Sequence, residues 1–335
     1  MTFPAATFGH LRDLTDAGGL YEHADLTAVR PEHGYCVDDV ARGLVVVSRS
    51  DDGQDDLRRQ YLSFVLAAQA EDGRFRNRRD VDLRWTDEPS VADCWGRALW
   101  GLGTTAAAPG CDDLREASLE SFARGAAWRS PHSRAMAFAG LGAAEELRVR
   151  PADEPARALL QDAARHVGRP AESAEWPWPE PRLTYANAAL PDVLLAAGSA
   201  LDQPLLIVDG LLLLDWLLGV QTRDGHLSVV PVGGRGPRDV IGGFDQQPIE
   251  VAALADACAR AYALTGDPRW RDGVESAAAW FLGSNDAGTA LLDVVSGGGC
   301  DGLEAQGRND NQGAESTLAL LSTLQHARAL ALTGS

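Results

Sequence analysis

The sequence predicts an all-α fold, a toroid of six helical hairpins of the (α/α)6 type, and three observations lead to this prediction. Twelve segments show helical spacing of apolar residues, whereas strand-like runs are few and short, the best being 227–231. Helices rich in Ala and Gly alternate with amphipathic helices that carry a charged face. The motif Gln-x-x-Asp-Gly occurs twice, at 69–73 and 221–225, each time after an amphipathic helix.

The expected helices follow one another along the chain with short connections. No linker or low-complexity segment interrupts the 335 residues, so we expect a single domain, 1–335. In both copies of the repeated motif, Asp-Gly predicts a turn with positive φ, after which the chain returns toward the centre. The helices are expected at 7–17, 36–48, 55–69, 90–102, 113–128, 133–146, 154–167, 185–200, 205–220, 247–264, 268–282 and 313–332.

Inner and outer helices differ in composition. The charged faces of 113–128 and 154–167 are typical of outer helices. Ala- and Gly-rich helices, which we expect to be crowded on both faces, begin near residues 36, 90, 133, 185, 247 and 313, and each follows a polar cluster. If the inner helices run the same way, these clusters converge on one face of the ring. We therefore expect them to form the rim of one pocket.

Charge and composition exclude several classes of protein. The net charge of −18 repels phosphate backbones and does not favour anionic lipid, so nucleic acid is not an expected partner. All 30 basic residues are Arg, which excludes Schiff-base and pyridoxal chemistry because both need a lysine amine. Five Cys without a C-x-x-C pair indicate reduced thiols rather than a zinc site. We expect no metal and no cofactor.

We expect no targeting signal, and therefore a cytoplasmic location. The first ten residues have neither a basic region nor a long apolar run, so no signal peptide is expected. The longest apolar run, 204–214, is broken by Asp209 and is too short to span a bilayer.

The polar clusters contain the residue types that a sugar site needs. Aromatic faces stack on sugar rings, Asn, Gln and Arg bind hydroxyls, and paired carboxyls cleave glycosidic bonds. The candidate catalytic carboxyls are Asp38, Asp39, Glu180, Glu250 and Glu315. The candidate substrate-binding residues are His33, Tyr35, Arg42, Asp93, Trp95, Arg97, His132, Arg134, Trp176, Trp178, Tyr185, Asn187, Gln246, Gln247, Asn311 and Gln312.

The expected surroundings of the candidate carboxyls suggest which of them is the general acid and which is the general base. Desolvation by Trp176 and Trp178 would raise the pKa of Glu180 and suit it to be the general acid. Proximity to Arg42 and to a helix N-terminus would keep Asp38 or Asp39 ionised, as a base requires.

Structural roles fit some of the same residues. Asp38 and Asp39 can cap a helix and pair with Arg42. His132 fits a hydrogen-bonded core histidine, and Asp93 fits a buried hydrogen-bonding role.

The run from Tyr35 to Arg42, Tyr-Cys-Val-Asp-Asp-x-Ala-Arg, resembles the signature of a bacterial helical domain fused to, or encoded beside, family-4-type glycosyltransferases. Blocks similar to others of that family are Trp95-Gly-Arg-Ala-Leu-Trp100, Leu183-Thr-Tyr-Ala-Asn-Ala188, Gln246-Gln-Pro-Ile-Glu250 and Asn311-Gln-Gly-Ala-Glu-Ser-Thr317. The resemblance implies an (α/α)6 toroid similar to glycoside hydrolases, without a metal, and a glycosyltransferase as a candidate partner. Transferase activity is not implied, because this chain has no Rossmann-type glycine loop.

A second resemblance concerns the repeated motif. Gln-x-x-Asp-Gly looks like the Gln-Trp motifs of triterpene cyclases, but their Asp-x-Asp-Asp acid is replaced here by Cys-Val-Asp-Asp, and the expected pocket is polar.

The favoured function is therefore inverting hydrolysis of an oligosaccharide or glycan. Phosphorolysis is a variant in which Arg42, Arg97 or Arg134 holds phosphate. A non-catalytic glycan-binding partner of a glycosyltransferase is the alternative, and a sugar epimerase, for which His33 and His132 are the candidate pair, is third.

Overall fold

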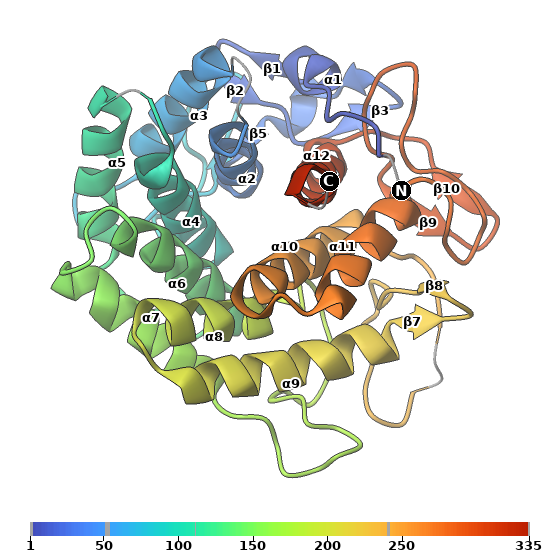
Figure 1. Cartoon of the computed structure of the whole chain (residues 1–335). Helices are drawn as coiled ribbons and strands as arrows, with labels where there is room; N and C mark the ends of the chain where they lie inside the picture. The colour runs from blue at the N-terminus through green and yellow to red at the C-terminus, as the bar shows by residue number, and fades with distance from the viewer. Residues whose placement is uncertain (1–2, 51–53, 111, 240–241, 334–335) are drawn as a thin grey trace.

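The computed structural model describes residues 3–50, 54–110, 112–239 and 242–333 and confirms the helical toroid (Figure 1). Six inner helices surround the axis, and each contacts the next around the ring. The last inner helix also contacts the first, which closes the ring. The inner helices are α2 (Val37–Ser48), α4 (Asp93–Ala107), α6 (Ser133–Leu147), α8 (Ala189–Ala200), α10 (Pro248–Thr265) and α12 (Ala314–Thr333).

Outer helices cover the inner ring. Five of them pack against the inner helix that precedes them in the chain, and the short α1 (Gly9–Asp13) packs against α12. The two ends of the chain therefore form the sixth hairpin together. The other outer helices are α3 (Asp55–Ala68), α5 (Asp112–Gly125), α7 (Glu154–Val167), α9 (Pro204–Val220) and α11 (Pro268–Phe281).

Two helices are shorter than expected by at least four residues. The segment expected at 7–17 is helical only over α1, because Asp16 accepts a hydrogen bond from the Gly18 amide and the chain turns into a hairpin. The helix expected from residue 185 begins at Ala189. There the Asn187 side chain accepts from the Thr184 amide at 2.9 Å, and Ala186 has a positive φ of 43°, so the preceding residues form a turn.

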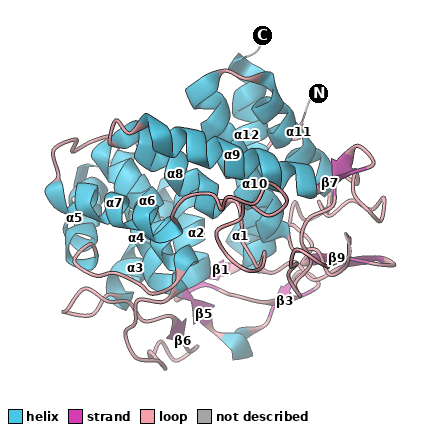
Figure 2. Ribbon diagram, turned by 90° about the horizontal axis from the view of Figure 1, so that it is seen from below, coloured by secondary structure: helices cyan, strands magenta, loops and turns pink. Residues whose placement is uncertain are grey.

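Short antiparallel strand pairs connect the helices. Figure 2 shows most of the strands and long loops gathered on one side of the helical ring. Of the strand expected at 227–231, only Leu227 lies in a strand, β8 (His226–Leu227), and residues 228–230 are not part of any strand. The pairs are β1 (Thr15–Asp16) with β2 (Gly19–Leu20), β3 (Ala24–Asp25) with β4 (Ala28–Val29), β5 (Tyr35–Cys36) with β6 (Arg78–Arg79), β7 (Thr222–Arg223) with β8 (His226–Leu227), and β9 (Gly302–Glu304) with β10 (Gly307–Asn309).

Both copies of the repeated motif form the expected turn. Gly73 and Gly225 have positive φ values of 94° and 84°. Gln69 secures the first turn, since its side-chain oxygen accepts from the Ser121 hydroxyl at 2.8 Å. After this turn the chain returns to the centre and pairs as β6 with β5, beside the start of α2.

The inner helices approach most closely between α4 and α6, where glycines replace larger side chains. A Cβ at Gly103 would lie 2.1 Å from the Gly142 carbonyl oxygen, and a Cβ at Gly142 would lie 2.2 Å from the Leu99 carbonyl oxygen. Backbone-to-backbone contact of this kind leaves no room for a methyl group. None of the helices in the described part of the chain has the length and hydropathy that a membrane crossing requires.

We predict that Gly103→Ala lowers the free energy of unfolding by roughly 1–3 kcal/mol, because the added methyl group must push two backbones apart. Chemical denaturation measures the change. The matched control is Gly219→Ala on α9, where an added Cβ meets nothing within 4 Å. That variant should be as stable as the wild type or up to about 1 kcal/mol more stable. Equal stability of Gly103→Ala and wild type would contradict the close contact.

Candidate functional site

Two adjoining cavities open on the face where the inner helices begin. The first, the acidic cavity, has a volume of about 380 Å³ and is lined by Glu22, His23, Cys36, Asp38, Asp39, Arg42, Arg78, Gln247, Asp301, Asn309, Gly313, Glu315 and Ser316. The second, the tyrosine cavity, has a volume of about 530 Å³ and is lined by Asp38, Asn77, Arg78, Asp87, Ser90, Ala92, Asp93, Cys94, His132 and Tyr185. Asp38 and Arg78 line both, so the two cavities meet there.

Arg42 joins two carboxyls on the floor of the acidic cavity. Its Nη1 lies 2.5 Å from Asp39 Oδ1, and its Nη2 lies 2.5 Å from Glu315 Oε2. Asp39 and Arg42 come from the first turns of α2, and Glu315 comes from the first turn of α12. Burial raises the pKa of Asp39 to about 7 against the attraction of Arg42, with Glu315 adding to the rise. Asp39 therefore holds a proton in part of the molecules near neutral pH.

Asp38 lies beside a different cation. Its Oδ1 is 3.3 Å from Arg97 Nε, and its Oδ2 accepts from the Asn77 side-chain amide at 2.9 Å. Asn77 is held in turn by its backbone amide, which donates to Asp87 at 2.7 Å. The neighbouring carboxyls Asp38 and Asp39 thus differ in exposure and in partners, which allows them different chemical roles.

Glu180 and Glu250 belong to a buried network around Arg134 that does not line either cavity. The Arg134 guanidinium pairs with Glu180 and donates to Asn187 Oδ1 at 2.8 Å. The Asn187 amide donates to Glu250 at 2.8 Å. Burial raises the pKa of Glu250 to about 7, with Asn187 and Arg134 opposing that rise.

The environment expected for Glu180 is not found. Trp176 and Trp178 pack against Trp216 of α9, with ring centroids 5.1 Å and 5.9 Å from it. The Trp176 indole donates to the backbone oxygen of Glu180, while the Glu180 carboxylate pairs with Arg134. The indoles therefore fix the loop against α9, and the Glu180 carboxylate has a cationic partner.

Tyr185 presents the aromatic face of the tyrosine cavity. Its side chain is 41% exposed, and its hydroxyl donates to Asp93. The Arg134 guanidinium lies over the Tyr185 ring, 5.6 Å from the ring centroid. A ring fixed in this way can stack on a sugar face.

The remaining candidates divide between residues that line a cavity and residues that lie elsewhere. Gln247 lines the acidic cavity and His132 lines the tyrosine cavity, whereas Arg97 lies deeper, below the floor. Residues that line neither cavity have other contacts: His33 with His23, Tyr35 with Asp16, Trp95 with the Gly125 carbonyl, Gln246 with Asp286 and Trp280, Asn311 with the Leu26 amide, and Gln312 with Ser296.

Several lining residues lie outside the sequence clusters. Glu22, His23 and Asp301 come from loops between short strands, and Asn77 and Arg78 follow the Asp72–Gly73 turn. For Asn77 and Arg78 the sequence held a usable signal, because the chain was expected to return to the centre after that turn.

Three potential metal ligands are close together in the acidic cavity. Glu22, Cys36 and Asp39 each place one ligand atom within 4.8 Å of the others. Arg78 pairs with Glu22, Arg42 pairs with Asp39, and the Cys36 thiol donates to Asn77 Oδ1 at 3.3 Å. Each of the three groups therefore already has a partner within the protein.

Comparison with known proteins identifies the fold and leaves the activity open. No protein-family model and no curated protein sequence matches the chain. Its structure is similar to that of a cellobiose 2-epimerase from Spirochaeta thermophila, with a TM-score of 0.68, 13% identity, and 96% of this chain and 93% of that chain covered. A D-mannose isomerase matches with a TM-score of 0.69, 10% identity and coverage of 96% and 94%. A family 76 α-mannanase from Bacteroides thetaiotaomicron matches with a TM-score of 0.65, 10% identity and coverage of 97% and 94%.

The burial of Glu250 predicts a pH-dependent stability. Its folded pKa of about 7 exceeds the ordinary value of 4.5, so the folded state holds this proton more tightly than the unfolded state. The stability that this provides is present below pH 4.5 and is lost as the pH rises to about 7.

We therefore predict that Glu250→Gln becomes more stable, relative to wild type, when the pH rises from about 4.5 to about 8. The free energy of unfolding at both pH values measures this. Glu116→Gln, at an exposed position, should show no such relative gain. A relative stability of Glu250→Gln that stays constant with pH would contradict the raised pKa.

Proposed function

We propose that this protein hydrolyses a glycosidic bond of an oligosaccharide or glycan, with Asp38 and Asp39 as the catalytic pair. The observation that carries this proposal is the position of Asp38 at the junction of the two cavities. A sugar chain that lies across both cavities would place a linkage beside Asp38 and its neighbour Asp39. Volumes of about 380 and 530 Å³ are in the usual range for small-molecule sites, roughly 300–1,000 Å³.

Asp39 has the properties of the general acid. It is buried on the cavity floor and its pKa is about 7, so it can protonate the leaving oxygen near neutral pH. Asp38 serves as the second carboxyl. Together the pair supplies the two groups that glycoside hydrolysis requires.

The position of the pair bears on the stereochemistry. Cys36 Sγ lies 3.7 Å from Asp38 Oδ2 and within 4.8 Å of an Asp39 oxygen, so both carboxyls share one corner of the cavity. The carboxyl spacing of retaining enzymes, about 5–5.5 Å, and the lower part of the roughly 6.5–9.5 Å range of inverting ones both fit within these contacts. In the retaining reaction, Asp38 attacks the anomeric carbon as Asp39 protonates the leaving group. Water then cleaves the glycosyl ester, with Asp39 accepting its proton.

A sugar epimerase is the second candidate, and the placement of two histidines favours it. His23 lines the acidic cavity and His132 lines the tyrosine cavity, one on each side of the shared Asp38. Two bases on opposite faces of a sugar carbon can remove and return a proton. Structural neighbours on this fold include a cellobiose 2-epimerase and a D-mannose isomerase. Deuterium incorporation at C2 of a reducing sugar in heavy water would identify this activity.

A cytoplasmic location and a glycosyltransferase partner are further proposals. Four described cysteines, Cys36, Cys94, Cys258 and Cys300, are buried and free, as expected in a reducing compartment. Support for the partner comes from the sequence resemblance alone, and co-purification with a glycosyltransferase encoded beside this chain would test it.

We predict that Asp38→Asn and Asp39→Asn each lower kcat/KM on a cleaved oligosaccharide by roughly 10²–10⁴-fold, while the oligosaccharide still binds. In the wild type, kcat/KM should fall as the pH rises above about 7, because the acid Asp39 loses its proton. Screening defined oligosaccharides with and without phosphate identifies the substrate and separates hydrolysis from phosphorolysis. Product NMR reports the anomer first formed.

Asp82→Asn is the matched control, since Asp82 is exposed and pairs with Arg84 outside both cavities. It should turn over at the wild-type rate. If either Asp38→Asn or Asp39→Asn did so as well, the assignment of the pair would be wrong. Oligosaccharide binding without any turnover would support the glycan-binding alternative instead.

A further inference from the structure

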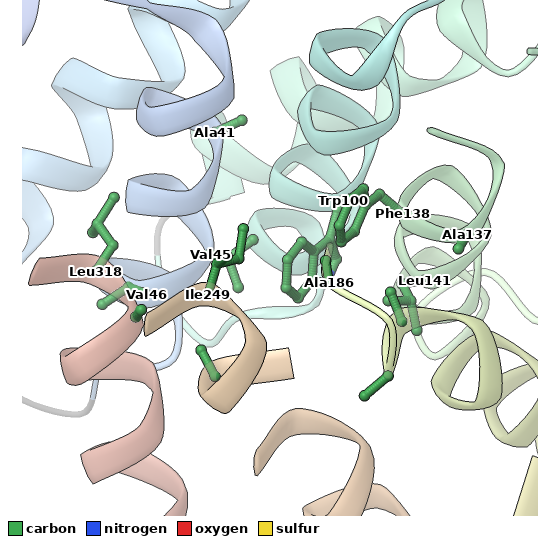
Figure 3. Close-up of a cluster of buried hydrophobic side chains, with 14 of the residues drawn as sticks. Ala41, Val45, Val46, Trp100, Ala137, Phe138, Leu141, Ala186, Ile249 and Leu318 are labelled. Atoms are coloured by element: carbon green, nitrogen blue, oxygen red, sulfur yellow. The ribbon is translucent and has the colours of Figure 1, made fainter. Parts of the chain in front are cut away.

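A third cavity runs along the axis of the ring beneath the acidic cavity. We call it the axial cavity; side chains from the inner helices α2, α4, α6, α8, α10 and α12 and from the turn before α8 surround it (Figure 3). Its walls are apolar and include Val45, Trp100, Phe138, Leu141, Ile249 and Leu318. Alanines such as Ala252 and Ala319 leave the space open.

The axial cavity is continuous in its lining with the candidate site. Arg42 and Glu315 line both the axial and the acidic cavity. About 50 Å³ is open to the centres of water-sized spheres, whereas one water needs only about 10–15 Å³ on that measure. Its polar groups lie at the two ends, so a water in the middle would lack partners. An apolar group of several atoms suits this space better than water does.

Arg97 supplies a second, independent indication of a ligand. It lines the axial cavity, is 3% exposed, and makes no side-chain hydrogen bond to any described residue. Its Nε lies near Asp38 Oδ1 but without the geometry of a hydrogen bond, and its guanidinium lies 4.2 Å from the Phe138 ring centroid. Buried guanidinium groups usually have acceptors for their N–H groups. Arg97 therefore has donors available for a bound molecule.

We propose that the axial cavity binds a small apolar substituent of the sugar substrate, an aryl or short alkyl group attached through oxygen. Arg97 donates a hydrogen bond to that oxygen and the apolar group occupies the space between Trp100 and Leu318. This inference rests on the proposed function in taking the substrate to be a sugar in the acidic cavity. A neutral acceptor suits Arg97 better than an anion, because Asp38, Asp93 and Glu315 carry negative charge nearby.

Phenol and xenon test the site without any sugar. Phenol offers a ring and an oxygen, whereas xenon reports only the apolar space. We expect phenol to bind the wild type, and to bind at least about tenfold more weakly to Ala252→Leu, whose added side chain fills the cavity. Arg97→Met should weaken phenol binding but leave xenon binding in place. NMR titration of phenol and of ¹²⁹Xe measures both.

Two further variants separate loss of the cavity from unfolding and from effects of the Ala→Leu change outside the cavity. Ala319→Leu fills the cavity from α12 rather than α10 and should also abolish phenol binding. Ala123→Leu makes the same change on the exposed surface of α5 and should bind phenol like the wild type. Phenol binding that is absent in the wild type, or unchanged in both cavity-filling variants, would overturn the proposal.

Matched methyl and phenyl glycosides of common hexoses then test the substrate class. Phenyl glycosides should bind roughly 10–100-fold more tightly than methyl glycosides, and the cavity-filling variants should lose this preference. Equal binding of the two series would overturn the substituent assignment. If phenyl glycosides bind preferentially but are never cleaved, the proposed hydrolysis fails while the axial site stands.

Discussion

The ion pairs of Arg42 hold together both the ring and the candidate site. Its guanidinium contacts Asp39 from its own helix and Glu315 from α12, the first and last inner helices of the chain. Taking Arg42 and Asp39 out of water is costly unless each has its partner, whereas Glu315 stays 38% exposed. The closure of the toroid, the floor of the acidic cavity and the upper end of the axial cavity thus depend on one side chain.

Buried charge is concentrated at the two ends of the inner ring, with apolar contacts between them. On the site face, Arg134 links the start of α6 to the residues that precede α8. On the opposite face, Arg49 at the end of α2 pairs with Asp256 of α10, which His326 of α12 also contacts. Ion pairs have defined geometry, whereas apolar contacts permit sliding, so these networks fix the rotation and height of each inner helix.

The fold could be predicted from the sequence because it follows from local periodicity and from the contrast between Ala-rich and charged helices. The site could be predicted only in part. Asp38, Asp39, Gln247 and Glu315 lie on a cavity because each stands at the start of an inner helix, Gln247 just before α10 and the others in a first turn.

Other parts of the site depend on contacts between distant segments. Glu22 and His23 reach the cavity through strand pairings that no local pattern encodes. Trp176 and Trp178 pack against Trp216, which comes from an outer helix about forty residues away in the sequence. A Glu that is close to a Trp in the sequence is therefore a weak basis for predicting desolvation of its carboxyl, because the packing partner of the indole is not known from the sequence.

The sharing of one hairpin between the two ends of the chain has a consequence for biosynthesis. Helix α12 is 20 residues long. It emerges from the ribosome after the other five inner helices have been made. Until then, α2 and α10 lack the neighbour that separates them, and α1 lacks the surface on which it packs. Contacts between residues so far apart in sequence slow folding and prolong the exposure of apolar surface. A nascent chain of this protein therefore holds an incomplete, open ring until α12 has been made.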